Sequence, residues 1–254
     1  MSILDSFQLA GKVAIVTGCD TGLGQGMARA LAQAGADIVG VNVSDPQDTA
    51  AQVRGMGRQF LDLRANLSDT ACIDGLVQQA KGLAGHVDIL VNNAGIIRRD
   101  DAIKFSEKDW DDVLNLNLKS VFFFSQAVAR QFIAQGGGGK IINVASMLSF
   151  QGGVRVPSYT ASKSGVMGIT RLMANEWAGQ RINVNAIAPG YMATNNTAPL
   201  RADAERSAAI LERIPAGRWG VPDDLAGPVV FLASQASDYV NGYTVAVDGG
   251  WLAR

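Results

Sequence analysis

The stretch KVAIVTGCDTGLGQGMARALAQAGADIVGVNVSD, residues 12–45, decides the fold of this chain. An apolar, β-branched run at 13–17 meets a glycine-rich turn, which leads into a segment of helical periodicity and then a second apolar run at 38–43. This order predicts a strand, a turn, a helix and a second strand. Glycines permit the tight turn and let backbone N–H groups approach a diphosphate, which the helix N-terminus attracts. The stretch therefore predicts a dinucleotide site at Gly18, Gly22 and Gly24.

The residue at the end of the second run bears on which dinucleotide binds. Sites of this kind usually hold the adenosine ribose with an acidic residue about twenty positions after the glycines, and here that residue is Asn42. An amide can bond a ribose hydroxyl, but it does not repel a 2′-phosphate. No arginine or lysine lies in the glycine loop before Gly22, and Val43 stands where a basic partner would help. We therefore expect NAD as the cofactor, with NADP the less favoured alternative.

The rest of the chain alternates strand-like and helix-like segments, which predicts a parallel sheet with helices on both faces. The expected fold class is α/β, a Rossmann-type doubly wound sheet of about seven strands, in a single domain over residues 1–254. A segment near 190–218 is expected to cover the substrate, and Pro228 is expected to kink the last helix. Further strands are expected near 59–63, 87–92, 140–145, 182–188 and 243–247, and helices near 22–34, 47–56, 68–83, 106–134, 157–178 and 222–234.

Composition excludes several classes of function. A formal net charge of −1, without basic blocks, argues against nucleic acid or an anionic membrane surface as a partner. The chain opens without a charged region followed by an apolar stretch, and it contains no run of about eighteen apolar residues, so we expect a cytoplasmic protein. With 2 cysteines and 1 histidine, neither a disulfide framework nor a metal site is expected.

Ser146, Tyr159 and Lys163 form the pattern that carries chemistry. A tyrosine and a lysine one helical turn apart project from the same face, so the ammonium can favour the ionised phenol and lower its pKa. The serine ends the strand-like segment KIINVAS, which would bring its hydroxyl close to the phenol. Such a trio suits proton transfer to or from a carbonyl or alcohol oxygen.

Further motifs accompany this trio: Thr17-Gly18-x-x-x-Gly22-x-Gly24, Asn92-Asn93-Ala94-Gly95 after VDILV, Asn117 in WDDVLNLNLKSVF, and Pro189-Gly190 with Thr194. Together they make the chain similar, over essentially its whole length, to the classical short-chain dehydrogenase/reductase family. The resemblance implies that Ser146 holds the substrate oxygen, that Lys163 also reaches the nicotinamide ribose, and that Asn117 retains a water molecule beside Lys163. The expected cofactor-binding residues are Gly18, Thr21, Gly22, Leu23, Gly24, Asn42, Asn66, Leu67, Asn93, Ala94, Gly95, Tyr159, Lys163, Pro189, Gly190, Met192 and Thr194.

The segments expected around the nicotinamide are polar and rich in arginine. Guanidinium groups bind carboxylates bidentately, and amides suit sugar hydroxyls. A hydroxylated acid therefore fits better than a steroid or a long acyl chain. For Arg99, as for the other arginines, a solvated surface charge is the competing interpretation, and Arg218 is interpreted as structural. The candidate substrate residues are Arg98, Met147, Gln151, Arg155 and Tyr191.

Four longer stretches narrow the resemblance: residues 92–112, 145–168, 185–203 and 237–254. They are similar to those of family members that interconvert the hydroxyl and keto forms of a deoxy sugar acid in uronate breakdown. Two alternatives stay open, a reductase of another carbonyl substrate such as an acyl thioester or a polyol, and a non-catalytic dinucleotide-binding regulator. The helices expected near 106–134 and 157–178 carry apolar residues on more than one face. Together with the family resemblance, this implies a homotetramer.

Overall fold

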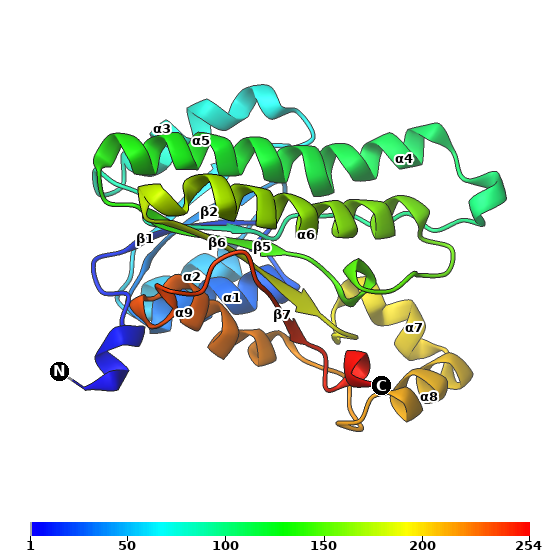
Figure 1. The fold of residues 1–254 in the computed structure, drawn as a ribbon. Helices are drawn as coiled ribbons and strands as arrows, with labels where there is room; N and C mark the ends of the chain where they lie inside the picture. The colour runs from blue at the N-terminus through cyan, green and yellow to red at the C-terminus, as the bar shows by residue number, and fades with distance from the viewer. Residues whose placement is uncertain (1) are drawn as a thin grey trace.

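The computed structural model describes residues 2–254, and Met1, which falls within the predicted domain, lies outside them. Seven parallel strands form one sheet in the order β3-β2-β1-β4-β5-β6-β7 (Figure 1). This confirms the predicted sheet. The strands are β1 (Val13–Thr17), β2 (Asp37–Asn42), β3 (Phe60–Arg64), β4 (Ile89–Asn92), β5 (Gly139–Val144), β6 (Ile182–Pro189) and β7 (Thr244–Val247).

Helices cover both faces of the sheet, so two separate cores form. One core packs beneath α1 (Gly22–Gln33), α2 (Gln47–Gly55) and α9 (Ala226–Ala233), and the other beneath α3 (Ile73–Lys81), α5 (Ser120–Gln135) and α6 (Pro157–Trp177). Figure 1 shows these two layers above and below the strands. The remaining helices are α4 (Glu107–Leu114), α7 (Ala198–Ala202) and α8 (Ala204–Arg213).

The burial of β1 explains why residues 13–17 form a continuous apolar run. All five of its residues are buried. Ala14 and Val16 enter one core, while Val13 and Ile15 enter the other, because successive side chains of a strand point to opposite faces. A strand buried on both faces needs apolar residues at every position.

The strand order reverses between β1 and β4. The chain runs outward from β1 to β3 and then returns to place β4 on the other side of β1. In open sheets of this kind, ligands bind in the crevice at the carboxyl ends of the strands where the order reverses. The helices α7 and α8 lie toward the same end of the sheet (Figure 1), which is where a covering segment near 190–218 was expected.

One of the helical expectations needs correction. The segment 222–234 is a 3₁₀ turn, Pro222–Leu225, followed by α9, in which Pro228 is the third residue. Pro228 therefore does not kink a helix, since a first-turn nitrogen has no intrahelical partner to lose. The segment 106–134 is α4 and α5 joined by one π-helical turn, Asn115–Lys119. Gly136, with φ of 75°, ends α5.

Candidate active site

The glycine loop forms an anion-binding cradle at the start of α1. Gly18 and Gly22 have positive φ angles of 61° and 59°, which disfavour other residues. A Cβ on Gly24 would lie 2.0 Å from the Gly18 carbonyl oxygen. Thr21 is the N-cap residue of α1, yet its side chain makes no capping hydrogen bond. Thr21 thus leaves the first N–H groups of the helix without a side-chain cap within residues 2–254, so the loop fits the diphosphate of a dinucleotide.

Thr17 and Asn93 fix this cradle to the end of β4. The Thr17 hydroxyl accepts hydrogen bonds from the backbone N–H groups of Asn93 and Ala94, both at 2.9 Å. The Asn93 amide in turn donates to the carbonyl oxygens of Thr17 and Gly18, at 3.0 and 2.8 Å. The Asn93–Gly95 segment is therefore placed beside the glycine loop, as predicted from the sequence.

Asn42, the last residue of β2, is hydrogen-bonded to the glycine loop. Its side chain is only 2% exposed, and its Oδ1 accepts a 2.7 Å hydrogen bond from the Cys19 backbone N–H. Within residues 2–254 its Nδ2 has no hydrogen-bond partner. The amide oxygen thus holds the glycine loop at Cys19, and the predicted contact of Asn42 with a ribose stays a prediction. After β3, Asn66 is exposed and its Oδ1 accepts from the Ser68 N–H, whereas Leu67 is buried in the core.

Ser146, Tyr159 and Lys163 come together at the carboxyl end of β5. Ser146 follows that strand and caps a 3₁₀ turn, accepting a hydrogen bond from the Leu148 N–H at 3.1 Å. Tyr159 and Lys163 lie in the first two turns of α6. The Lys163 Nζ lies 5.7 Å from the centroid of the Tyr159 ring. The trio predicted from the spacing is therefore a spatial cluster.

The protonation of this cluster differs from the sequence expectation. Burial raises the pKa of Tyr159, and the Ser146 hydroxyl and the charge of Arg99 oppose that rise. Lys163 was expected to lower this pKa. Instead its ammonium is buried and donates a 2.7 Å hydrogen bond to the Val144 carbonyl oxygen, and burial lowers its own pKa to about 8. For the protein without a bound cofactor, the predicted fall in the Tyr159 pKa is therefore wrong.

Asn117 lies at the centre of the π-helical turn and is fully buried. Its Oδ1 accepts from the Ile96 N–H at 2.9 Å, and its Nδ2 donates to the Ile96 carbonyl oxygen at 2.8 Å. The Asn117 Nδ2 atom also lies 3.4 Å from the Ser162 hydroxyl oxygen. The side chain thus ties the segment after β4 to α6. Its predicted role in retaining a water stays a prediction.

The sequence reasoning missed Ser149. Its hydroxyl donates a 2.6 Å hydrogen bond to the Lys163 carbonyl oxygen and accepts one of 3.3 Å from the Ser146 N–H. It therefore fixes the backbone of Ser146 to that of α6. The only signal in the sequence is a serine three residues after Ser146, which is too common a pattern to single out.

The loop after β6 closes over the glycine cradle. Pro189 ends β6, and a Cβ on Gly190 would lie 2.7 Å from the Asp248 Cα. Met192 is buried and pairs with Gly220 in an isolated bridge. The methyl group of Thr194 lies 3.8 Å from the position that a Cβ on Gly22 would occupy. The two loops expected to enclose the cofactor are therefore in contact.

The arginines near the site differ in whether their charge is already neutralised. Arg98 lies 3.4 Å from Asp109, and Arg155 lies 3.0 Å from Asp101. Arg99 makes no ion pair within residues 2–254. Its Nη2 donates to the Asn196 carbonyl oxygen at 3.5 Å, and its charge acts on the Tyr159 phenol. Within residues 2–254, Arg99 thus differs from Arg98 and Arg155 in having no carboxylate partner.

The other substrate candidates take part in packing. Met147 contacts the buried face of α8, and Tyr191 lies edge-on to Trp219 and Trp251, with ring centroids 5.5 and 4.8 Å away. Gln151 accepts a 3.4 Å hydrogen bond from Arg213, which ends α8. These contacts dock α8 against the loop that carries Ser146.

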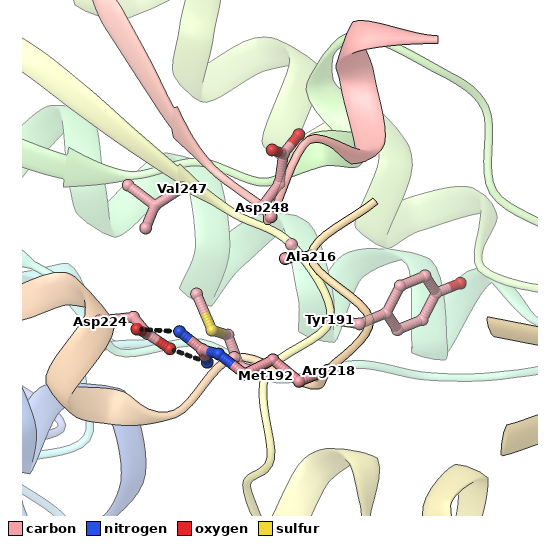
Figure 2. Close-up of a pocket in the computed structure, with 10 residues that line it drawn as sticks. Tyr191, Met192, Ala216, Arg218, Asp224, Val247 and Asp248 are labelled. Carbon is pink, nitrogen blue, oxygen red and sulfur yellow. Dashed lines mark hydrogen bonds and ion pairs between the residues drawn. The ribbon is translucent and has the colours of Figure 1, made fainter. Parts of the chain in front are cut away.

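A cavity of about 140 Å³ lies behind the loop after β6 (Figure 2). Arg218 makes a bidentate ion pair there with Asp224, at 2.7 Å for both bonds, and this pair lowers the pKa of the Asp224 carboxyl to about 2. Arg218 thus holds the turn before α9, which supports the structural interpretation. The residues that line the cavity are Gly190, Tyr191, Met192, Ala216, Arg218, Gly220, Asp224, Val247, Asp248 and Gly249.

Comparison with known proteins decides the family. A family model described as "Enoyl-(Acyl carrier protein) reductase" matches residues 18–252. The solved structure of a short-chain type dehydrogenase/reductase from Mycobacterium marinum is 35% identical, covers 100% of both chains and superposes with a TM-score of 0.94. The chain belongs to the short-chain dehydrogenase/reductase family. This confirms the resemblance inferred from the motifs, and the chain is accordingly an oxidoreductase that acts on CH–OH groups.

Two other members of this family are more informative about chemistry. The chain is 73% identical over 252 residues to the 2-dehydro-3-deoxy-D-gluconate 5-dehydrogenase of Escherichia coli (strain K12), with 99% of this chain and 100% of that protein covered. It is 39% identical to a gluconate 5-dehydrogenase from Burkholderia cenocepacia J2315, solved in complex with NADP and tartrate, with a TM-score of 0.94 and 100% of both chains covered. Members of the family use NAD or NADP.

Two observations concern other kinds of site. In residues 2–254, every helix is too short or too polar to cross a bilayer. The same residues contain no group of three or more histidine, cysteine, aspartate or glutamate side chains arranged to hold a metal ion.

Proposed function

We propose that this protein is a nicotinamide-dependent oxidoreductase that interconverts a hydroxyl and a keto group on a deoxy sugar acid of the 2-dehydro-3-deoxy-D-gluconate type, in uronate breakdown. The observation that carries the proposal is the cluster of Ser146, Tyr159 and Lys163 beside the glycine cradle. The 73% identity to a 2-dehydro-3-deoxy-D-gluconate 5-dehydrogenase supports the substrate class. The retained tyrosine and lysine argue against a non-catalytic regulator.

A nicotinamide bound at the glycine loop would supply or accept the hydride, and the residues of the chain donate or accept the proton. In reduction, Tyr159 donates its phenolic proton to the substrate oxygen, and in oxidation it accepts that proton. Because burial raises the pKa of Tyr159, the phenol is protonated at neutral pH and is ready to donate. Ser146 holds the same substrate oxygen by a hydrogen bond. Lys163, held by the Val144 carbonyl, keeps a positive charge next to the phenol.

We assign the substrate carboxylate to Arg99. Its charge has no carboxylate partner among residues 2–254 and acts on the Tyr159 phenol. A guanidinium without a carboxylate partner gains a bidentate pair of charge-assisted hydrogen bonds when the carboxylate of an acid binds. An acyl thioester or a polyol offers no carboxylate at this point, which is why we place them second.

We infer that NAD is preferred to NADP. The polar groups exposed just after β2 and along β3 include Asp45 and Asp62, whose side chains are 58% and 31% exposed. Two carboxylates repel a 2′-phosphate at short range. Because a family member binds NADP, we expect a graded preference and not exclusion.

The test is turnover by purified protein with 2-dehydro-3-deoxy-D-gluconate, D-gluconate, a simple polyol and an acyl thioester, each with NAD and NADP in the appropriate redox state. Tyr159→Phe is expected to lower kcat by about 10²–10⁴-fold while leaving NAD affinity nearly unchanged. Arg99→Gln is expected to raise KM for the sugar acid, and Arg130→Gln, on the remote face of α5, is the matched control. Preference for the thioester or the polyol over both acids would overturn the substrate assignment.

We further propose one domain over residues 1–254, with the segment near 190–218 covering the substrate, and a homotetramer in the cytoplasm. The single sheet supports the first part. Exposed apolar residues on α4, α5 and α6 support self-association: Trp110, Phe123, Ile133 and Leu172. Two free cysteines fit a reducing compartment. Light scattering that gives only monomer at micromolar concentration would contradict the tetramer.

A further inference from the structure

A small ion cluster lies at the carboxyl ends of β2 and β3. Arg64 ends β3 and pairs in register with Asn42, the last residue of β2. Its Nε lies 2.6 Å from an Asp62 oxygen, and its Nη2 lies 2.9 Å from an Asp45 oxygen. One guanidinium is thus shared by two carboxylates. The three side chains stay 31–58% exposed, so the cluster is open to a ligand.

The position of this cluster relates it to the adenosine end of a dinucleotide. In glycine-loop sites the ribose is held at the carboxyl end of the second strand. Here Asn42 is turned inward to the Cys19 N–H, and Val43 carries no charge. The first charged groups beyond them are therefore Asp45 and Arg64. Arg64 also approaches the Val43 carbonyl oxygen, at 3.5 Å.

Arg64 is also the only basic residue close to these strand ends in the sequence. The segments 42–48 and 64–69 read NVSDPQD and RANLSD. A 2′-phosphate bound there has no other guanidinium or ammonium in either segment to pair with. Arginine suits this task, because its planar fork binds phosphate bidentately. In the structure, Asp45 and Asp62 pair with the Arg64 guanidinium.

The geometry points to Arg64 as the group through which this chain accepts a 2′-phosphate, and to Asp45 as the competitor that keeps that acceptance weak. A bound 2′-phosphate takes the Nη atoms of Arg64 in place of the Asp45 carboxylate. The cluster of one arginine and two aspartates carries a net negative charge, so removing the Asp45 charge both frees the fork and lowers the repulsion. The inference rests on the dinucleotide site of the proposed function and not on its substrate.

The experiment measures binding of two small probes to the full-length protein by titration calorimetry at fixed ionic strength. The probes, 5′-AMP and adenosine 2′,5′-bisphosphate, differ only in the 2′-phosphate. The variants are Asp45→Asn, Arg64→Gln and the double variant. Asp74→Asn and Arg130→Gln are matched controls, because Asp74 and Arg130 also form an exposed ion pair, 2.7 Å apart, on α3 and α5.

Asp45→Asn is expected to raise affinity for the bisphosphate by roughly tenfold, and Arg64→Gln to lower it by roughly tenfold or more. Affinity for 5′-AMP should stay within about twofold in every variant. The double variant should lose the gain of Asp45→Asn. The inference is overturned if that gain survives without Arg64, if both probes weaken equally in Arg64→Gln, or if neither probe binds the parent. Failure of the sugar acid as substrate leaves these binding results unchanged.

Discussion

The Ser149 hydroxyl donates a 2.6 Å hydrogen bond to the backbone carbonyl oxygen of Lys163. The same hydroxyl accepts a hydrogen bond from the Ser146 N–H. Ser146 and Lys163 come from different elements, the end of β5 and α6, and no covalent geometry fixes their separation. Ser149, which is buried between them, fixes this separation through its hydroxyl. That hydroxyl bonds backbone atoms of Ser146 and Lys163, and not the Tyr159 phenol that exchanges a proton with the substrate oxygen. Ser149 is therefore a positioning residue.

We predict that Ser149→Ala lowers kcat by roughly tenfold with little change in cofactor affinity, because the Ser146 hydroxyl loses its fixed place relative to Tyr159. The loss of a buried hydrogen bond should cost about 1 kcal/mol of unfolding free energy. Ser237→Ala is the control, since Ser237 is also buried and, within residues 2–254, its hydroxyl bonds only the carbonyl oxygens of Leu232 and Ser234. Equal kcat in the two variants, with equal stability, would show that Ser149 does not position the site.

A second prediction concerns the glycine cradle. Gly24→Ala places a methyl group 2.0 Å from the Gly18 carbonyl oxygen and 2.5 Å from the Asn93 Nδ2. The loop must shift, so NAD affinity measured by calorimetry should fall by more than about tenfold. Gly75→Ala, in α3, meets no atom within 4 Å and is expected to raise the unfolding free energy by up to about 1 kcal/mol without affecting NAD. Unchanged NAD affinity in Gly24→Ala would contradict the cradle.

The order of strands and helices was predictable because each buried strand needs an apolar run and each helix needs a 3.6-residue period. β1 shows this well, with side chains in both cores. The trio of Ser146, Tyr159 and Lys163 was predictable because two of its members lie four residues apart on one helix. Both inferences use short-range geometry that secondary structure fixes.

The contacts that the sequence did not indicate depend on partners distant in the sequence. Arg155 is paired with Asp101, and Asn42 is bound to the Cys19 N–H, contacts of 54 and 23 residues in separation. No periodicity indicates which way such side chains turn. The predicted fall in the pKa of Tyr159 was wrong for a related reason, since burial of the phenol raises its pKa and outweighs the neighbour one turn away. Long-range packing decides these features.

The two cysteines give a third prediction, on reactivity. Cys19 is a fully buried residue of the glycine loop, and burial raises the pKa of its thiol to about 12. Cys72 is partly exposed at the start of α3, with a pKa raised chiefly by its partial burial. Only the thiolate reacts with a disulfide reagent. Native protein should therefore show one thiol that titrates within minutes and a second that titrates only after unfolding. Loss of the fast thiol in Cys72→Ser identifies it.

The last prediction follows from the buried ammonium of Lys163, whose pKa burial lowers from 10.5 to about 8. Below about pH 8 the group is protonated in both the folded and the unfolded states, and the folded state bears the cost of burying the charge. Between about pH 8 and 10.5 the folded state releases its proton first, so the unfolded state binds more protons and this group makes the protein more stable as pH rises.

Lys163→Met removes this dependence, because a thioether does not titrate. The unfolding free energy of Lys163→Met should exceed that of the parent by up to about 3 kcal/mol near pH 7, since each pKa unit corresponds to about 1.4 kcal/mol. The hydrogen bond from Lys163 to the Val144 carbonyl makes the observed value smaller. The excess should shrink as pH approaches about 10. Tyr159 is present in both proteins, so its own titration largely cancels in the difference. Urea unfolding of both proteins near pH 7 and near pH 10 measures the effect, and a difference that does not change with pH would contradict the lowered pKa of Lys163.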